Sequence, residues 1–167
     1  MNEFKNYKLV LIGDQDVGKT TLIQTYYAGK YPLSPEQSSG SGFVVKNLEE
    51  EGIKLQIWDF DEHNSDSTYH QQLFKGTHVI FVCFDITSES SLENCADWSN
   101  LANRYCPKIP RVMIGCKLDK RPQIVQPYIQ EVAESAGIGK IRVCSARTGV
   151  NVEALFSEAI LIAKNRY

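Results

Sequence analysis

The sequence lacks a long hydrophobic run, a paired set of cysteines and an excess of charge of one sign. Its apolar runs fall far short of the ~20 residues that a membrane span requires, and its first residues form no signal-peptide core. The five cysteines are odd in number and show no C-x-x-C spacing, so neither a disulfide framework nor a zinc knuckle is predicted. A net charge of −2 gives no electrostatic reason to expect nucleic acid or an anionic membrane as a partner. These absences are typical of a cytoplasmic globular protein.

The residues that are present have the composition of an ordinary folded domain. Of the 167 residues, 43% are hydrophobic and 23% are charged, which excludes disordered, collagenous and coiled-coil chains. This length fits one domain over residues 1–167. Three histidines, His63, His70 and His78, lie in a polar segment without metal-ligand partners, so no histidine metal site is predicted. Several cysteines lie inside apolar runs, where we expect small buried side chains.

Short apolar runs alternate with helical patterns along the chain. Runs typical of strands covered on both faces occupy residues 7–12, 79–85, 111–116 and 141–144. Residues 43–48 and 54–59 are predicted to form an antiparallel hairpin. Helical patterns cover residues 19–27, 91–104, 126–136 and 151–164. The alternation predicts an α/β fold with a six-stranded, mostly parallel sheet, one antiparallel edge strand and helices on both faces.

A glycine-rich segment follows the first predicted strand and opens the first predicted helix. From Gly13 to Thr20 it reads Gly-Asp-Gln-Asp-Val-Gly-Lys-Thr, which matches G-x-x-x-x-G-K-[ST]. Its backbone N–H groups can form a nest for phosphate, Lys19 can bridge the β- and γ-phosphates, and the Thr20 hydroxyl can ligate Mg²⁺. The predicted phosphate-binding residues are Gly13, Asp16, Val17, Gly18, Lys19, Thr20 and Thr21. The segment therefore predicts binding of a nucleoside di- or triphosphate.

Two further segments, after the fifth and sixth predicted strands, favour guanine as the base. The first reads Cys116-Lys117-Leu118-Asp119, and its aspartate can accept hydrogen bonds from both N1–H and the exocyclic amine of guanine, a pairing that adenine cannot offer. The stem of Lys117 can lie along the base. The second is a Ser-Ala turn, whose backbone N–H can donate to the guanine O6. The predicted base-binding residues are thus Lys117, Asp119, Ser145 and Ala146.

Together these segments resemble the Ras superfamily of small GTPases over nearly the whole chain, and they are most similar to its Rab branch. The family's guanine motifs usually read N-K-x-D and S-A-K, whereas this sequence has Cys-Lys-Leu-Asp and Ser-Ala-Arg. The resemblance therefore implies that Cys116 and Arg147 also belong to the base-binding residues. Rab-like stretches cover residues 55–59, 84–91 and 145–152. The resemblance implies a P-loop G domain that binds GTP or GDP with Mg²⁺ and regulates vesicle traffic from the cytoplasm, with recruitment to an endomembrane if an anchor is present.

Two segments without clear periodicity fall where the family's switch I (about residues 29–42) and switch II (about residues 60–76) lie. Long irregular stretches in a compact domain are functional loops or failed assignments. By resemblance, Tyr31 takes the place of an aromatic that stacks on guanine, with a plain surface aromatic as the alternative. Ser38 takes the place of the threonine that senses Mg²⁺ and the γ-phosphate. Asp59 matches the aspartate that holds Mg²⁺ through water, with a solvated strand-end carboxylate as the alternative.

The family expects D-T-A-G-Q after the third strand, and this sequence has Asp-Phe-Asp-Glu-His. Glu62 replaces the glycine whose N–H meets the γ-phosphate, and its carboxylate would repel that phosphate. His63 replaces the glutamine that orients the attacking water, although an imidazole can still place a water. Gln15 replaces a phosphate-loop glycine that usually leaves room for that glutamine and for an arginine finger supplied in trans. A side chain there obstructs both. We therefore expect very slow hydrolysis of GTP to GDP and phosphate, with Lys19 and His63 as the catalytic candidates.

Nucleotide binding should survive these changes. Cys116 cannot reproduce the amide hydrogen bonds of the usual asparagine, a loss of ~1–3 kcal/mol or about one to two decades in affinity. Three interpretations remain open: a slow GTPase that cycles between two states, a pseudo-GTPase that holds nucleotide as a structural ligand, and an ATP-binding P-loop protein. The last is disfavoured because Asp119 suits guanine.

By resemblance, effectors and exchange factors would contact an apolar switch surface. Phe43 and Trp58 match two positions of that surface, and Leu73 stands where an aromatic is usual. Packing within the edge hairpin is the alternative role for Phe43 and Trp58. Rab-like membrane anchoring uses prenylated cysteines after a flexible tail, and residues 163–167 contain none. We expect membrane contact only through a lipidated tail outside this sequence, or a protein that works without a lipid.

Overall fold

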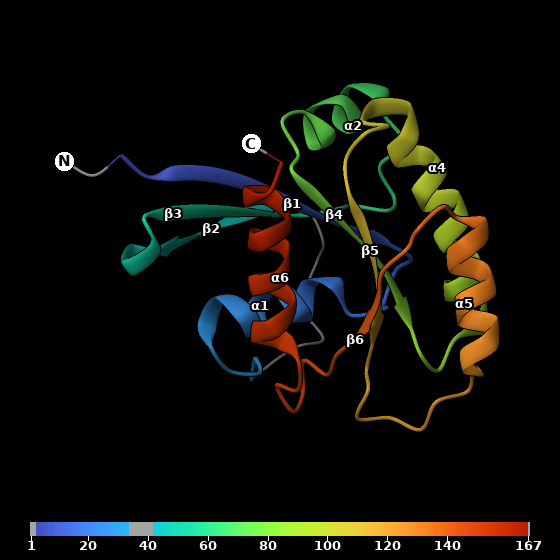
Figure 1. The fold of residues 1–167 in the computed structure, drawn as a ribbon. Coiled ribbons are helices and arrows are strands. Elements are labelled where there is room, and N and C mark those ends of the chain that lie inside the picture. The colour runs from blue at the N-terminus through green and yellow to red at the C-terminus, as the bar shows by residue number, and fades with distance from the viewer. Residues whose placement is uncertain (1–2, 34–41, 167) are drawn as a thin grey trace.

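A six-stranded sheet runs through the molecule in the order β2-β3-β1-β4-β5-β6 (Figure 1). The computed structural model describes residues 3–33 and 42–166. The strands are β1 (Lys5–Gly13), β2 (Gly42–Leu48), β3 (Ile53–Asp59), β4 (Val79–Asp85), β5 (Arg111–Cys116) and β6 (Ile141–Val143). Neighbouring strands are parallel except for β2, which pairs antiparallel with β3. The predicted α/β fold, with one antiparallel edge strand, is confirmed.

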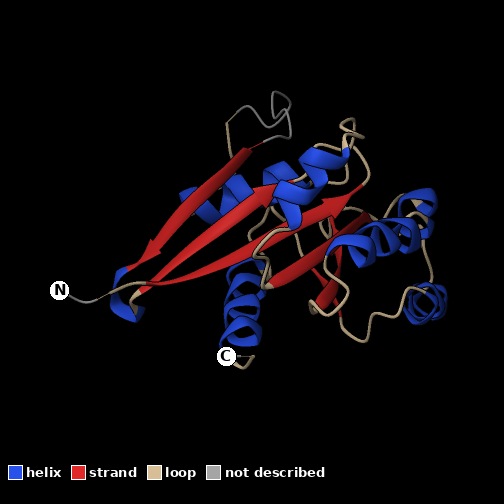
Figure 2. Cartoon of the chain, turned by 90° about the horizontal axis from the view of Figure 1, so that it is seen from above, coloured by secondary structure: helices blue, strands red, loops and turns tan. Residues whose placement is uncertain are grey.

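Helices cover both faces of this sheet (Figure 2). They are α1 (Lys19–Ala28), α2 (Ser67–Phe74), α3 (Glu89–Glu93), α4 (Cys95–Tyr105), α5 (Gln126–Ser135) and α6 (Val152–Lys164). One core joins α1 and α6 to the sheet, with Tyr26 stacked on Phe156 at 3.9 Å between ring centroids. The second core joins the other four helices to the opposite face. Among the described residues, no helix is long and apolar enough to cross a membrane.

The central strands are buried on both faces, as their continuous apolar runs predict. All seven residues of β4 are buried, and β3 alternates between buried and half-buried side chains because it lies next to the edge strand. At Gly115 of β5, an added Cβ would come within 3.0 Å of Ile86 and Phe84, so the strand passes too close to its neighbours for a side chain. These packed strands form a rigid base for the loops at their ends.

The structure departs from the predicted elements at two places. The predicted helix over residues 91–104 is two short helices, α3 and α4, which meet at Asn94. The irregular segment of switch II contains α2, which the sequence analysis missed. The Asp66 carboxylate caps this helix by accepting from the Thr68 N–H at 2.8 Å. The hydrophobic pattern of α2 is weak in the sequence, because the helix has only eight residues and its buried face includes the polar His70.

Candidate functional site

The glycine-rich segment lies at the carboxyl end of β1 and leads directly into α1. Gly13 has φ of 148°, and a Cβ there would come 2.3 Å from the Cys83 carbonyl oxygen, so only glycine fits. Gly18, with φ of 111°, is the N-cap of α1. Val17 is buried and anchors the loop in the core, while Gln15 and Asp16 are exposed. The loop thus places backbone N–H groups at a helix N-terminus, the arrangement that binds phosphate.

Lys19 is held inside this loop, and its residue is only 5% exposed. Its Nζ donates to the carbonyl oxygens of Gly13 at 2.8 Å and Asp14 at 2.7 Å. The same ammonium group lies 3.5 Å from a carboxylate oxygen of Glu62. Lys19 therefore lies within the loop, with a switch II carboxylate against its ammonium group, and its phosphate-binding role stays a prediction.

Asp14 fixes the loop to α4, a role that the sequence analysis missed. Its two carboxylate oxygens accept from Asn94 Nδ2 and Trp98 Nε1, both at 2.7 Å. These partners are 80 and 84 residues away in the chain, so no local pattern could reveal the contact. The edge of the Trp98 ring also meets the ring of Phe60, with centroids 5.2 Å apart, which links the loop to switch II.

Thr20 and Asp59 form the part of the site suited to a divalent cation. The Thr20 hydroxyl donates to Asp59 Oδ2. Asp59 Oδ1 is buried and has no hydrogen-bond partner among residues 3–33 and 42–166. Burial raises the pKa of the Asp59 carboxyl, an effect that Thr20 and Lys19 oppose. A hydroxyl beside an orphaned carboxylate oxygen supplies hard oxygen donors of the kind that Mg²⁺ prefers.

Protein side chains alone do not make a complete metal centre here. Within the described part of the chain, no group of three or more His, Cys, Asp or Glu residues is arranged to hold a metal ion. A cation at Thr20 and Asp59 would therefore take further ligands from phosphate and water, as Mg²⁺ usually does. The predicted third contributor, Ser38, and most of switch I lie outside the described residues. Tyr31 is 37% exposed, and its stacking role stays a prediction.

The two guanine segments lie side by side at the ends of β5 and β6. The Ser145 hydroxyl donates to Asp119 Oδ1 at 2.8 Å and accepts from the Thr148 N–H at 3.1 Å. The Leu118 N–H donates to the Cys144 carbonyl oxygen at 2.9 Å. Ser145 is buried, Ala146 is half-buried and exposed Arg147 follows it in the turn. The structure brings these residues together at one edge of the sheet, and their role in binding guanine stays a prediction.

Lys117 joins the base segment to the phosphate segment. It has a φ of 67°, and its Nζ donates to the Asp16 carbonyl oxygen at 2.6 Å. The same Nζ forms an ion pair with Asp85 at 2.8 Å. Although burial favours the neutral form, hydrogen bonds from Lys117 and Thr87 lower the pKa of Asp85. The lysine is therefore locked in place by a carboxylate that stays ionised.

Buried thiols support the floor of the site. Cys83, Cys116 and Cys144 are each at most 3% exposed, which confirms the expected packing role. Cys116 lies against the phosphate loop, since a Cβ added at Gly18 would be 3.6 Å from the Cβ of Cys116. Burial raises the pKa of Cys83. A thiol in this position fills space but lacks the amide that the usual asparagine would provide.

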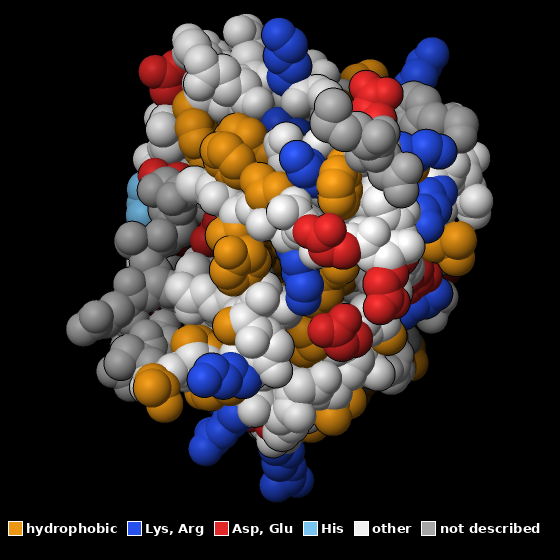
Figure 3. Space-filling model, turned by 90° about the vertical axis from the view of Figure 1, so that its left-hand side faces the viewer, with side chains coloured by type: hydrophobic (Ala, Val, Ile, Leu, Met, Phe, Trp, Pro, Cys, Tyr) orange, Lys and Arg blue, Asp and Glu red, His pale blue; other side chains and the backbone are white. Residues whose placement is uncertain are grey.

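The three residues predicted to form a partner surface differ in their exposure, and the partner role of Phe43 and Trp58 stays a prediction. Phe43 is 53% exposed and stacks on half-buried Trp58 with centroids 4.5 Å apart. Leu73 was expected on this surface, and that expectation is wrong: it is 1% exposed because α2 turns it into the core. Lys8 Nζ lies 4.1 Å from the Trp58 ring and donates to the carbonyls of Gln72 and Lys75. The hydrophobic side chains seen from the side of the β2–β3 hairpin form patches between acidic and basic ones (Figure 3).

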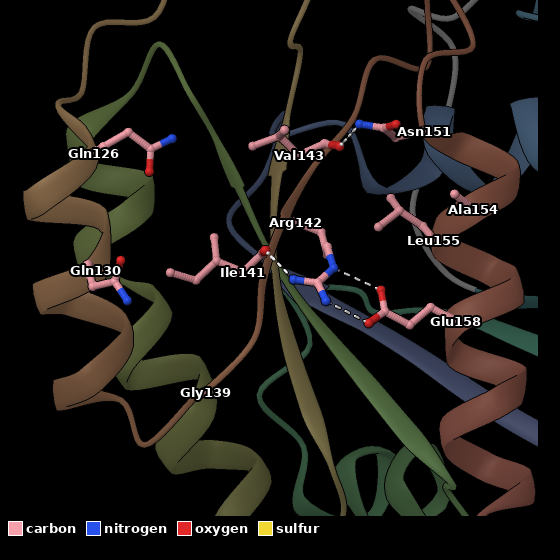
Figure 4. Close-up of a pocket in the computed structure, with 10 residues that line it drawn as sticks. All are labelled: Gln126, Gln130, Gly139, Ile141, Arg142, Val143, Asn151, Ala154, Leu155 and Glu158. Atoms are coloured by element: carbon pink, nitrogen blue, oxygen red, sulfur yellow. Dashed lines mark hydrogen bonds and ion pairs between the residues drawn. The ribbon is translucent and has the colours of Figure 1, made fainter.

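A cavity of about 520 Å³ lies elsewhere, at the free edge of β6 between α5 and α6. Within it, the Arg142 guanidinium makes a two-pronged ion pair with Glu158, and Asn151 Nδ2 donates to the Val143 carbonyl (Figure 4). None of the predicted nucleotide-binding residues lines this cavity. The Asn151 amide thereby covers one carbonyl oxygen of the edge strand.

A model of the Ras family matches residues 8–165. The chain is 31% identical to the Rho-related GTP-binding protein RhoD of Homo sapiens, over 95% of this chain and 83% of the relative. It is 32% identical to the Ras-related protein RIC1 of Oryza sativa subsp. japonica, over 96% and 81%. It is 28% identical to the Ras-related protein Rab-19 of Homo sapiens, over 95% and 74%.

Proposed function

This chain belongs to the Ras family of small GTPases, and from that premise we propose that residues 1–167 are one G domain that hydrolyses GTP very slowly. The ligands would be GTP and GDP with Mg²⁺, and the role would be Rab-like regulation of vesicle traffic. The observation that carries the proposal is the hydrogen bond from Lys117 Nζ to the Asp16 carbonyl at 2.6 Å. This bond joins the segment proposed to bind guanine to the loop proposed to bind phosphate. A single ligand that carries both a guanine base and phosphates requires these two segments to lie together.

Each retained residue has a definite task in this proposal. The N–H groups of the loop and Lys19 would bind the phosphates, while Asp119, braced by Ser145, would select guanine. Thr20 and Asp59 would hold Mg²⁺, which supplies neutralisation of the phosphate charge when bound. The orphaned Asp59 Oδ1 supports this assignment. These contacts provide binding and orientation without any group that activates water.

Three residues of the phosphate loop and switch II support the proposal of slow turnover. His63 is exposed, and its backbone N–H donates to Asp61 Oδ1 at 3.1 Å. Its imidazole is the candidate to place a water. Gln15 is exposed on the phosphate loop, where its side chain would occupy the space that an arginine finger needs. Glu62 brings a carboxylate to the phosphate lysine.

The test is to identify the nucleotide released from the denatured, purified protein by chromatography and then to follow single-turnover hydrolysis of GTP with Mg²⁺. We expect guanine nucleotide and a rate well below that of ordinary family members, and His63→Gln should raise that rate. Lys19→Ala, as a control, should lose nucleotide. Equal competition by ATP would overturn the guanine assignment, and an ordinary hydrolysis rate would overturn the slow one.

A second candidate is a pseudo-GTPase that binds nucleotide and never hydrolyses it. The ion pair between Lys19 and Glu62 favours this candidate, because it engages the lysine that would stabilise the transferred phosphoryl group. The same single-turnover assay distinguishes the two. Retained GTP with no GDP produced over days would support the pseudo-GTPase, whereas slow stoichiometric conversion would support the GTPase.

Partner proteins are proposed to contact the stacked pair of Phe43 and Trp58. This pair combines an exposed aromatic ring with a half-buried one on the switch side of the sheet. Aromatic side chains of this kind are enriched among the residues that dominate binding energy at interfaces. Phe43→Ala should weaken capture of a nucleotide-dependent partner without changing nucleotide affinity.

A further inference from the structure

The carboxylate of Glu62 contacts the ammonium group of the phosphate-binding lysine. The two groups lie 3.5 Å apart, with side chains 16% exposed for Glu62 and 5% exposed for Lys19. The other polar contacts of Lys19 Nζ in the described residues are the carbonyls of Gly13 and Asp14. Both carbonyls belong to the loop itself, so Glu62 is the contact that comes from outside it.

A pinned turn positions Glu62 for this contact. On one side, the Asp61 N–H donates to the Tyr69 hydroxyl at 2.8 Å. On the other, the His63 N–H donates to Asp61 Oδ1 at 3.1 Å, and the Asn64 N–H donates to the Asp61 carbonyl at 3.0 Å. Phe60, just before the turn, is 1% exposed and packs in the core. The main chain around Glu62 is thus fixed from α2, from the core and from within the turn.

A diphosphate and a triphosphate make different demands on Lys19. A diphosphate needs this ammonium group for β-phosphate oxygens, which leaves room for a carboxylate on it. A triphosphate needs the same group for a γ-phosphate oxygen as well, and it brings additional negative charge. Burial raises the pKa of Asp59, and the nearby carboxylates of Glu62 and Asp61 raise it further, so additional negative charge is disfavoured at this end of the site.

Building on the proposed function, we infer that the Glu62 carboxylate occupies the place beside Lys19 that a γ-phosphate oxygen would take. This contact makes guanosine diphosphate the preferred ligand. Glu62 is then a specificity-determining residue. In the diphosphate complex, the Glu62 carboxylate keeps its ion pair with Lys19. In the triphosphate complex it must leave Lys19, and the ion pair is lost. The turn around Asp61 would oppose that movement.

The test measures affinities of the whole chain, with Mg²⁺, for GDP and for a non-hydrolysable GTP analogue. We expect the wild-type protein to prefer GDP by about tenfold or more, in line with close charge pairs in binding sites. Glu62→Gln keeps the shape and removes the charge, so it should lower this preference by about tenfold through tighter triphosphate binding. Glu62→Asp, one methylene shorter, should fall between the two and serves as a second variant should Glu62→Gln prove unstable.

Asp61→Asn is the matched control. It removes a carboxylate from the same turn, keeps an oxygen to accept from the His63 N–H, and does not touch the Lys19 ion pair. We expect its GDP preference to change by less than about threefold, as for a charge that is not in contact. An equal effect of Asp61→Asn and Glu62→Gln would overturn the inference, because general repulsion would then explain it. Equal wild-type affinity for the two nucleotides would also overturn it while leaving the proposed function standing. Binding of neither nucleotide would instead refute the proposed function.

Discussion

Replacing Asp14 with alanine removes the contact that ties the phosphate loop to α4. The carboxylate accepts from Asn94 Nδ2 and Trp98 Nε1, both at 2.7 Å. In the Asp14→Ala protein these two donors lose their partner, and the loop loses its only hydrogen-bonded side-chain link to α4 among the described residues. The effect should therefore appear in global stability, and nucleotide affinity should also fall because the loop is less constrained.

The magnitude follows from the two bonds. A hydrogen bond to a charged group contributes ~1.5–3 kcal/mol, so two would contribute about 3–6 kcal/mol if fully buried. Asp14, Asn94 and Trp98 are all half-buried, so water replaces part of what is lost. We expect a decrease of about 2–3 kcal/mol in the free energy of unfolding. In a chain of this size, that change lowers the melting temperature by about 6–9 °C.

The assay is urea denaturation of the nucleotide-free protein, followed by far-ultraviolet circular dichroism. Gln15→Ala is the control, because Gln15 is the exposed neighbour in the same loop and its replacement should cost no more than about 0.5 kcal/mol. A double-mutant cycle with Trp98→Phe should give a coupling energy of about 1 kcal/mol between Asp14 and the indole N–H. Loss of less than about 0.5 kcal/mol in Asp14→Ala, or additive effects in the cycle, would refute the reasoning.

Three other predictions follow from the geometry of the site and its surroundings. Burial lowers the pKa of Lys8 from 10.5 to about 8, so the unfolded chain binds more protons than the folded one between these values. That difference should make stability rise with pH across this window relative to Lys8→Met, as measured by urea denaturation at several pH values; parallel profiles would contradict it. Asp59→Asn should stabilise the nucleotide-free protein by about 1 kcal/mol, because it removes a buried carboxylate with an orphaned oxygen. The same variant should lose the Mg²⁺ dependence of nucleotide affinity, and a dependence that persists on titration with EDTA would count against Asp59 as a ligand. Leu73→Ala should lower the free energy of unfolding by ~2–5 kcal/mol, whereas Phe43→Ala should cost about 1 kcal/mol, since only Leu73 lies in the core. Equal losses in thermal denaturation would argue against the different burial of the two side chains.

The phosphate loop and the strand pattern could be predicted from the sequence because their signals are local. Gly13 and Gly18 stand at fixed spacing around a turn, and both adopt the positive φ that glycine permits. The runs of β4 and β5 begin and end at the predicted residues, since strands buried on both faces must be continuously apolar. The α2 helix escaped prediction because its buried face combines polar and apolar side chains over only eight residues.

Residue types alone therefore determined which ligand chemistry this protein can offer: Lys19, Thr20, Asp59, Lys117 and Asp119 are present in a recognisable order. The tertiary structure decided how those groups are engaged. It set the carboxylate of Glu62 against Lys19, tied Asp14 to Trp98 and turned Leu73 into the core. Each of these contacts joins segments far apart in the chain. They depend on the order of strands in the sheet and on the docking of α2 and α4, which no local pattern specifies.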